Sequence, residues 1–199
     1  FGWASGWISG EDLETDLRGS RFKARYRSAS HRFALTLPGR HQAQNALAAL
    51  AVGDYFGLSA SVMRRTLLKV KPVWGRMEIL ALKEWIVIND SYNANPESMS
   101  AALEFLREVS RSEGRPAVAI LGGMFELGKS ARKAHREIGK KAASVGIDRL
   151  IAVGPLAAEM KRGAVEAGLT KGKILSFRRL EEALAPVKSL LHPGDLLLD

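Results

Sequence analysis

The chain has 199 residues, 46% of them hydrophobic, and can therefore bury the core of one large domain or of two small ones. It has no cysteine and only four scattered histidines, which excludes a disulfide scaffold, a thiolate zinc site and a cysteine nucleophile and argues against a metal site. No apolar run approaches the roughly 20 residues of a membrane span and no secretory signal is visible, so we expect a soluble cytoplasmic protein, whose net charge of +9 indicates an anionic partner.

The first segment with a clear pattern is basic. Between residues 21 and 27, Phe22, Ala24 and Tyr26 alternate with arginine and lysine, which is the period of a half-buried strand. Apolar residues again repeat with period two from Phe33 to Leu37, so we expect a two-stranded antiparallel hairpin within residues 17–40, with its basic side in solvent. A solvated sheet face explains this charge, and a nucleic-acid surface is the alternative. A reader of bases would usually add stacking aromatics or a helix-turn-helix, and neither pattern accompanies the charge.

The next segment changes to helical spacing. Residues 41–56 keep apolar side chains on one side, and Gly57 stands where a C-terminal cap belongs. A second small helix is expected within residues 59–70. Proline and glycine then make residues 71–75 a linker, and we place a domain boundary between residues 72 and 73.

Strand-like and helical segments alternate beyond the linker, which predicts an α/β domain with a mostly parallel sheet. One helix should start at Asn95 and Pro96, a favoured cap followed by a favoured first-turn residue. Another should start at Ser130. The expected strands are 85–89, 117–121, 150–153, 174–177 and 196–198, and the two helices should bury Met99, Ala102, Leu103 and Leu106, and Ala134, Ile138, Ala142 and Val145, respectively.

Residues 123–130, GMFELGKS, match the phosphate-binding pattern G-x-x-x-x-G-K-[ST] after an apolar strand. We reject this interpretation on chemical grounds. A phosphate cradle points several backbone N–H groups at an anion, whereas Glu126 would bring a negative charge toward that anion. A solvated loop would also leave the apolar side chains of Phe125 and Leu127 exposed to water.

Four segments in a fixed order resemble the Mur ligase family, over roughly residues 35–199. LPGRHQAQNALAA at 37–49 resembles the end of the family's central ATPase domain, and WGRME at 74–78 resembles the G-R-x-E that opens its C-terminal domain. INDSYNANPESM at 88–99 resembles the D-S-Y-N-A-N-P-x-S-M signature of the MurF branch. LGGMFELG at 121–128, with His135 beyond it, resembles the L-G-D-M-x-E-L-G signature of the same branch. Gln42 stands where the family commonly has asparagine, which puts a direct contact from that position in doubt.

The resemblance implies a fold and an activity. Residues 1–72 would be the C-terminal part of the central ATP-binding domain, a β-hairpin plus helices, and residues 73–199 a Rossmann-like, acceptor-binding domain. The implied reaction is ATP-dependent addition of D-alanyl-D-alanine to UDP-N-acetylmuramoyl-tripeptide through an acyl phosphate, by a monomer that binds no nucleic acid. The alternatives are a Mur ligase with another acceptor and a basic nucleic-acid-binding module.

The resemblance also implies that the phosphate-binding loop and the Mg²⁺ ligands lie upstream of Phe1. We therefore expect a fragment that is inactive alone, with no metal ligand among its own residues. The third residue of the peptide substrate stays open.

The same resemblance assigns roles to nine residues. Arg76 would reach the ATP phosphates as the catalytic group, because a guanidinium spreads charge over phosphate oxygens, and Asp90 would accept hydrogen bonds from the ribose hydroxyls. A linker arginine and a turn or capping aspartate are the respective alternatives. The other candidates are His41, Asn45, Tyr92 and Asn93 for the nucleotide, and Asn95, Glu126 and His135 for the substrate. Helix capping is the stronger alternative for Asn95. Ordering of their loop is the alternative for His41 and Asn45, and a helix-cap or packing role is the alternative for Glu126 and His135.

Overall fold

A computed structural model describes residues 2–3 and 6–199, and the chain divides into two compact units, Phe1–Val73 and Trp74–Asp199. The division falls inside the segment that Pro72 and Gly75 mark as a linker, one residue beyond the expected boundary.

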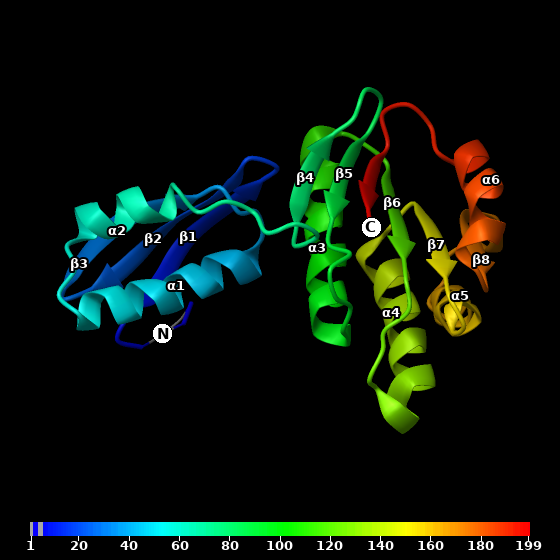
Figure 1. The fold of residues 1–199 in the computed structure, drawn as a ribbon, viewed down its shortest axis with the longest axis horizontal. Helices are drawn as coiled ribbons and strands as arrows, with labels where there is room; N and C mark the ends of the chain where they lie inside the picture. Colours follow the sequence, from blue (N-terminus) through cyan, green and yellow to red (C-terminus); the bar gives the residue numbers. More distant parts are fainter. Residues whose placement is uncertain (1, 4–5) are drawn as a thin grey trace. The chain divides into compact units, whose positions relative to one another are not determined.

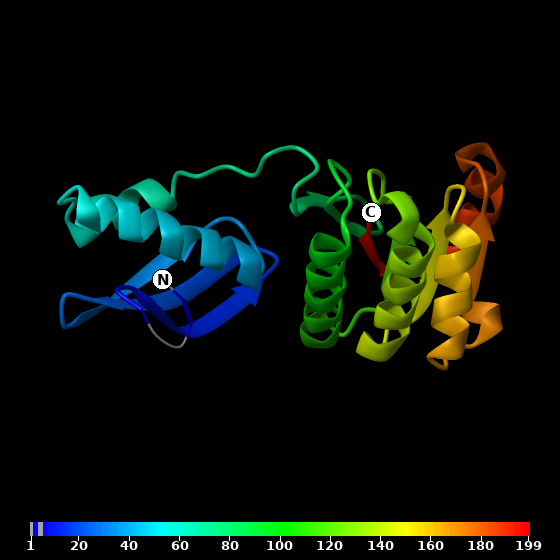
Figure 2. The same ribbon diagram turned by 90° about the horizontal axis from the view of Figure 1, so that it is seen from below.

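The first unit is a three-stranded antiparallel sheet with two helices on one face (Figures 1 and 2). The strands are ordered β1-β2-β3 and the helices follow them in the chain. The elements are β1 (Ser9–Asp16), β2 (Gly19–Tyr26), β3 (Ala29–Leu35), α1 (Arg40–Tyr55) and α2 (Ala60–Leu67). The predicted hairpin of β2 and β3 is confirmed, but it is part of a larger sheet, because β1 was not predicted.

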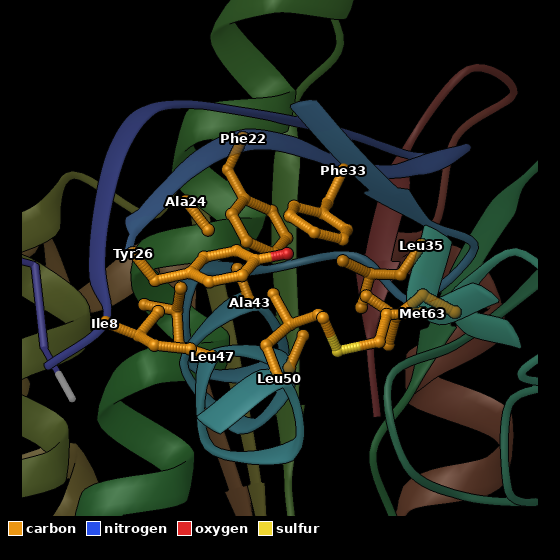
Figure 3. Close-up of a cluster of buried hydrophobic side chains, with 12 residues drawn as sticks. Ile8, Phe22, Ala24, Tyr26, Phe33, Leu35, Ala43, Leu47, Leu50 and Met63 are labelled. Atoms are coloured by element: carbon orange, nitrogen blue, oxygen red, sulfur yellow. The ribbon is translucent and has the colours of Figure 1, made fainter. Parts of the chain in front are cut away.

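The core of the first unit follows from the alternation in β2 and β3. Phe22 and Phe33 lie opposite each other in the register and stack with ring centroids 6.0 Å apart. Figure 3 shows these rings facing Leu47 and Leu50 of α1 and Met63 of α2. Each such side chain contributes about 1.5–3 kcal/mol on burial, so the apolar side of the sheet holds the helices in place.

The basic side of β2 is matched by an acidic β1. Cross-strand ion pairs join the two strands, with N···O distances of 2.8, 2.6 and 2.7 Å for Arg21–Asp16, Lys23–Asp12 and Arg25–Glu11. From the sequence we expected a purely basic surface here, because the acids lie outside residues 17–40. The structure corrects that view: much of the charge is paired within the sheet.

The second unit contains one six-stranded sheet in the order β4-β5-β9-β6-β7-β8 (Figure 1). All neighbouring pairs from β5 to β8 are parallel, and β4 is antiparallel to β5. The strands are β4 (Glu78–Ala81), β5 (Ile86–Asn89), β6 (Ala117–Leu121), β7 (Arg149–Val153), β8 (Ile174–Phe177) and β9 (Leu196–Leu198). The expected α/β fold with a mostly parallel sheet is confirmed, with β4 as an unpredicted edge strand.

Helices cover both faces of this sheet. Figure 2 shows α3, α4 and α5 side by side on one face. The connection from β8 to β9 runs backward across the sheet, so a right-handed crossover puts α6 on the other face, where Val187 and Leu191 pack near Ile151. The helices are α3 (Pro96–Glu113), α4 (Ala131–Val145), α5 (Ala157–Glu166) and α6 (Leu180–Leu190).

Both predicted helix starts are confirmed, with Asn95 and Ser130 as the caps, whereas the predicted buried faces hold to different degrees. Asn95 and Ser98 form a capping box at the start of α3, and the predicted buried stripe of this helix is confirmed. In α4 the buried face contains His135 and Gly139 in addition to Ile138 and Ala142, whereas Ala134 and Val145 are only half-buried. This face is therefore rotated slightly from the predicted stripe.

Candidate functional site

The carboxyl ends of β5, β9 and β6 form a switch point in the sheet. The chain leaves β5 over one face and returns to β9 over the other, so β9 lies between β5 and β6, as the mark at the chain's end in Figure 1 shows. Connections that diverge in this way leave a crevice at the carboxyl edge, where α/β proteins bind ligands. A cavity of about 300 Å³ lies there. Its lining includes Asp90, Ser91, Tyr92, Asn93, Met99, Gly122, Gly123, Phe125 and Asp199.

Asp90 is the first residue after β5 and is held from two sides. Its backbone N–H donates to the carbonyl of Asp199 at 2.7 Å, which continues the pairing of β5 with β9. Its side-chain Oδ1 accepts from the backbone N–H of Met77 at 3.0 Å. The carboxylate is thus fixed at the edge of the cavity.

Burial controls the charge of this carboxylate. Desolvation raises the pKa of Asp90 to about 6, although the Met77 N–H and the positive charge of Arg76 act in the opposite direction. Burial raises the pKa of Asp199 as well. Two carboxyl groups with raised pKa values therefore line one cavity, and a ligand that donates hydrogen bonds to them would favour their ionised forms.

Arg76 lies against the loop that follows β5. Its guanidinium carbon is 4.4 Å from the centroid of the Tyr92 ring, a cation–π distance. The backbone N–H of Tyr92 donates to the carbonyl of Gly75 at 3.0 Å. Gly75 has φ of +66°, and a Cβ there would lie 2.9 Å from that nitrogen, so the contact requires glycine. The end of the linker segment is thereby joined to the loop that carries Asp90.

The two asparagines of this loop differ in what their side chains do. Asn93 lines the cavity, and its Oδ1 accepts from the N–H of Ala94 at 3.0 Å. The Oδ1 of Asn95 accepts from the N–H of Ser98 at 2.8 Å, which caps α3. This bond supports the capping alternative for Asn95 over direct contact with a substrate.

His135 is buried, with 1% of its surface exposed. Its Nε2 accepts from the backbone N–H of Met124 at 3.0 Å, and its Nδ1 lies 2.7 Å from the carbonyl of Ala131, to which it donates in this tautomer. Both ring nitrogens are therefore used to hold the loop after β6. The arrangement supports the packing alternative for His135, which shapes the cavity through Gly123 and Phe125 rather than by contact. Glu126 lies exposed on the same loop, with φ of +62°.

His41 and Asn45 belong to the first unit, where they stand one turn apart on α1. Burial lowers the pKa of His41, which keeps its imidazole neutral near pH 7. The Nδ2 of Asn45 donates to Oε1 of Gln42 at 3.4 Å, and Asn45 is exposed. Arg76, Asp90, Tyr92 and Asn93 are brought together in the second unit.

The apparent phosphate-binding segment does not form a cradle. The N–H of Met124 is used by His135, and the N–H of Ser130 donates to the carbonyl of Leu127. Lys129 lies in a single 3-10 turn, Gly128–Ser130. This turn does not point a ring of free backbone N–H groups at an anion. Its resemblance to a phosphate-binding loop is limited to the sequence pattern.

Residues 75–198 match the model of the family described as "Mur ligase, glutamate ligase domain". The chain belongs to the Mur ligase family. It is 31% identical over 189 residues to the UDP-N-acetylmuramoyl-tripeptide--D-alanyl-D-alanine ligase of Bacillus subtilis (strain 168), which covers 94% of this chain and 40% of that protein. The Escherichia coli (strain K12) ligase of the same name is 35% identical over 144 residues, 72% of this chain and 31% of that protein.

A solved structure supports the same placement. The chain matches a crystal structure of MurF from Acinetobacter baumannii with a TM-score of 0.88 and 26% identity, over 99% of this chain and 42% of that one. The chain thus spans less than half the length of these Mur ligase relatives.

Sequence reasoning missed several residues that build this Mur ligase site. Glu78 and Asn89 hold the linker end and the loop after β5 together, and Asp199 adds a second carboxyl group to the cavity. Glu78 and Asn89 stand within quoted motifs, but their roles depend on the pairing of β4 with β5. Because β4 was not predicted, nothing in the sequence placed the two side chains together.

Proposed function

We propose that this chain is part of an ATP-dependent ligase that adds D-alanyl-D-alanine to UDP-N-acetylmuramoyl-tripeptide and releases ADP and phosphate. The curated relatives that carry this name support the proposal. The observation that carries it is local: Arg76, Asp90 and Tyr92, which come from two separate motifs, meet at a cavity on the carboxyl edge of the sheet.

Each residue of this group has a role that its position supports. The Asp90 carboxylate accepts hydrogen bonds from the ribose hydroxyls, which favours its charged form. Tyr92 and Asn93 line the adenosine. Arg76 is exposed and therefore free to meet phosphate oxygens with its guanidinium. In the first unit, His41 and Asn45 contribute contacts to the adenine base.

The reaction proceeds in two steps. A carboxylate oxygen of the tripeptide attacks the γ-phosphorus of ATP, and the bond to the bridging oxygen breaks as ADP leaves. The uncharged amine of the dipeptide then attacks the acyl carbon, and phosphate leaves as the amide forms and a proton is lost. Arg76 stabilises the charge that develops on the transferred phosphoryl group.

Magnesium accompanies ATP in such chemistry. Within residues 2–3 and 6–199, no group of three His, Cys, Asp or Glu side chains could hold a metal ion. We assign no magnesium ligand to the described residues. We propose that Glu126, and the loop that His135 holds beside the cavity, lie near the acceptor.

The test is acceptor-dependent phosphate release by a ligase that carries this chain. With UDP-N-acetylmuramoyl-tripeptide and ATP present, we expect D-alanyl-D-alanine to stimulate release more than D-alanine, D-glutamate or a diamino acid does. A preference for one of the single amino acids would assign the chain to another Mur ligase activity. Tripeptides ending in lysine or in diaminopimelate would identify the third residue.

We further propose a cytoplasmic monomer, since the nucleotide substrates are cytoplasmic metabolites. None of the helices in the described part of the chain is long and apolar enough to cross a membrane. The paired charges of β1 and β2 weaken the alternative of a nucleic-acid-binding module.

A further inference from the structure

Glu78, two residues after Arg76, accepts hydrogen bonds from two different segments of the chain. It is the first residue of β4 and lies opposite Asn89, the last residue of β5, in the antiparallel register. Its Oε2 accepts from Nδ2 of Asn89 at 3.2 Å and from the backbone N–H of Gly75 at 3.5 Å. One carboxylate oxygen therefore joins the residue before Arg76 to the end of β5.

Asn89 extends this junction to the loop that lines the cavity. It is 7% exposed, and its Oδ1 accepts from the hydroxyl of Ser91 at 2.6 Å and from its backbone N–H at 3.3 Å. The amide side chain thus donates at one end and accepts at the other. A buried amide in this position has a defined orientation, because reversing it would break both sets of bonds.

The main chain on both sides of Arg76 is held in place. The carbonyl of Gly75 accepts from the N–H of Tyr92, and the N–H of Met77 donates to Oδ1 of Asp90. Met77 is 1% exposed and adopts φ of +53°, a conformation that a bulky residue keeps only when its surroundings impose it. When the main chain is rigid, only the rotatable bonds of the exposed side chain must be ordered on ligand binding, so less conformational entropy is lost.

We propose that Glu78 and Asn89 are positioning residues for Arg76: their hydrogen bonds fix the Gly75–Met77 segment, so that the guanidinium is held on Tyr92, a residue that lines the cavity. The inference rests on the proposed role of Arg76 with ATP. The competing account is that the two residues only stabilise the pairing of β4 with β5. In that case their effect on turnover would not depend on Arg76.

The test is a set of double-mutant cycles in a ligase that carries this chain. Glu78→Ala should lower kcat by up to about 10²-fold, the cost of misplacing a catalytic group by roughly 1 Å. In the Arg76→Ala background the same substitution should cause almost no further loss, because the group that it positions is gone. Equal losses in both backgrounds would overturn the inference.

A reversal of donor and acceptor gives a second cycle. Asn89→Asp sets two carboxylates against each other and should lower kcat. Combining it with Glu78→Gln restores a donor facing an acceptor, so the double variant should recover the part of the loss that comes from the two facing carboxylates. Recovery should be incomplete, because the Gly75 N–H donates to the same Oε2 and loses its acceptor in that variant. No recovery would contradict the inference. Glu78→Gln alone keeps an acceptor oxygen and should remain close to the unsubstituted enzyme.

Controls separate folding and function from positioning. Glu84→Ala, an exposed acid in the turn between β4 and β5, should leave kcat unchanged. In the 199-residue chain itself, amide hydrogen exchange at Met77 and Tyr92 should accelerate in Glu78→Ala and not in Glu84→Ala. Unchanged exchange would overturn the inference without any assay of activity. Absence of acceptor-dependent phosphate release from the unsubstituted ligase would instead contradict the proposed function.

Discussion

Arg76 combines a fixed main chain with an exposed side chain, which is the arrangement expected of a residue that meets a ligand. An arginine with a structural role usually forms an ion pair through its guanidinium, whereas the guanidinium of Arg76 stacks on the aromatic ring of Tyr92. If Arg76 has the proposed role, phosphate oxygens would draw the guanidinium away from this ring. Tyr92 would then hold Arg76 before ATP binds, in addition to lining the cavity.

The first prediction concerns the charge of Arg76. In a ligase that carries this chain, Arg76→Ala should lower kcat by roughly 10²- to 10³-fold, about 2.7–4 kcal/mol, because one electrostatic donor to the transition state is lost. Arg76→Lys should recover only part of this rate, since an ammonium keeps the charge but lacks the planar fork. Steady-state kinetics with saturating ATP measures both effects.

Melting curves of the same two variants supply the control. An exposed side chain contributes little to folding, so both variants should melt close to the unsubstituted protein. Near-normal kcat in Arg76→Ala would remove this residue from the active site. A large drop in melting temperature would show that its role is structural.

The second prediction concerns the pH dependence that Asp90 creates. Its pKa of about 6 in the folded chain lies above the unfolded value of 3.8, so the folded state binds the proton more tightly. The contribution of Asp90 to stability therefore falls as the pH rises from about 4 to about 6 and is constant above that range. Asp90→Asn should reduce this fall, because asparagine can still accept from Met77 but does not ionise. Carbon-13 NMR of the Asp90 carboxyl measures the midpoint directly.

Burial also raises the pKa of Asp199, so the stability of the Asp90→Asn variant should still fall to some extent as the pH rises. Asp12→Asn is the control. The hydrogen bond and charge of Lys23 lower the pKa of Asp12, so its contribution changes only below pH 4. A midpoint for Asp90 near 4 would rule out the desolvation account.

At the scale of elements, α4 and α5 approach each other through two glycines. A Cβ at Gly139 would lie 1.9 Å from the carbonyl oxygen of Met160, and one at Gly163 would lie 1.9 Å from that of Arg136. Both obstacles are backbone atoms, which no change of rotamer can move. The two helices can therefore pack at this distance only while both positions lack a side chain.

The third prediction follows from this packing. Gly139→Ala and Gly163→Ala should each destabilise the second unit by about 1–3 kcal/mol, the usual cost of overpacking. Thermal unfolding should show a drop of a few degrees or more. Gly172→Ala is the matched control, because nothing lies within 4 Å of a Cβ there and φ is ordinary. An equal drop in the control, or none in the two helix variants, would refute the packing account.

Local pattern predicted the elements that have a strong period. The alternation in β2 and β3 and the cap and stripe of α3 depend on residues close together in the chain, so sequence was sufficient. β1, with the sequence SGEDLETD, carries no such alternation, and its partners lie on β2. It pairs with β2 in an antiparallel register that brings its acids to the basic side of that strand, and only the register reveals this interaction. β4 has four residues, too few for a period to appear.

The candidate site shows the same division. Arg76, Asp90 and Tyr92 could be named because whole motifs resemble a family, and the structure groups them. The hydrogen bonds that hold these residues in place were not predictable. Glu78 accepts from Asn89 on the neighbouring strand, and His135 accepts from the backbone N–H of Met124, eleven residues earlier in the chain. Such hydrogen bonds depend on three-dimensional geometry, which hydrophobic period and motif spacing do not encode.

At the scale of the whole molecule, net charge does not locate the ligand site. The excess of +9 indicated an anionic partner, but the basic strand β2 faces an acidic neighbour. The large open hollow beside this face is likewise lined by Asp12 and Glu14 as well as Arg32 and Arg64. Charges of both signs in one surface weaken binding to a polyanion, so the ligand site has to be sought at the carboxyl edge of the second unit.

The last prediction tests whether phosphate chemistry can occur at the apparent phosphate-binding segment. The 199-residue chain should hydrolyse no ATP above background, because the N–H groups of Met124 and Ser130 are already used and the described residues offer no magnesium site. In a ligase that carries this chain, Lys129→Ala should leave kcat within about twofold, the usual range for an exposed substitution. Arg76→Ala, assayed beside it, shows that the assay detects a loss. Hydrolysis by the chain that disappears with Lys129→Ala would mean that Gly128–Ser130 binds phosphate after all, and the site would have to be moved from the end of β5 to the end of β6.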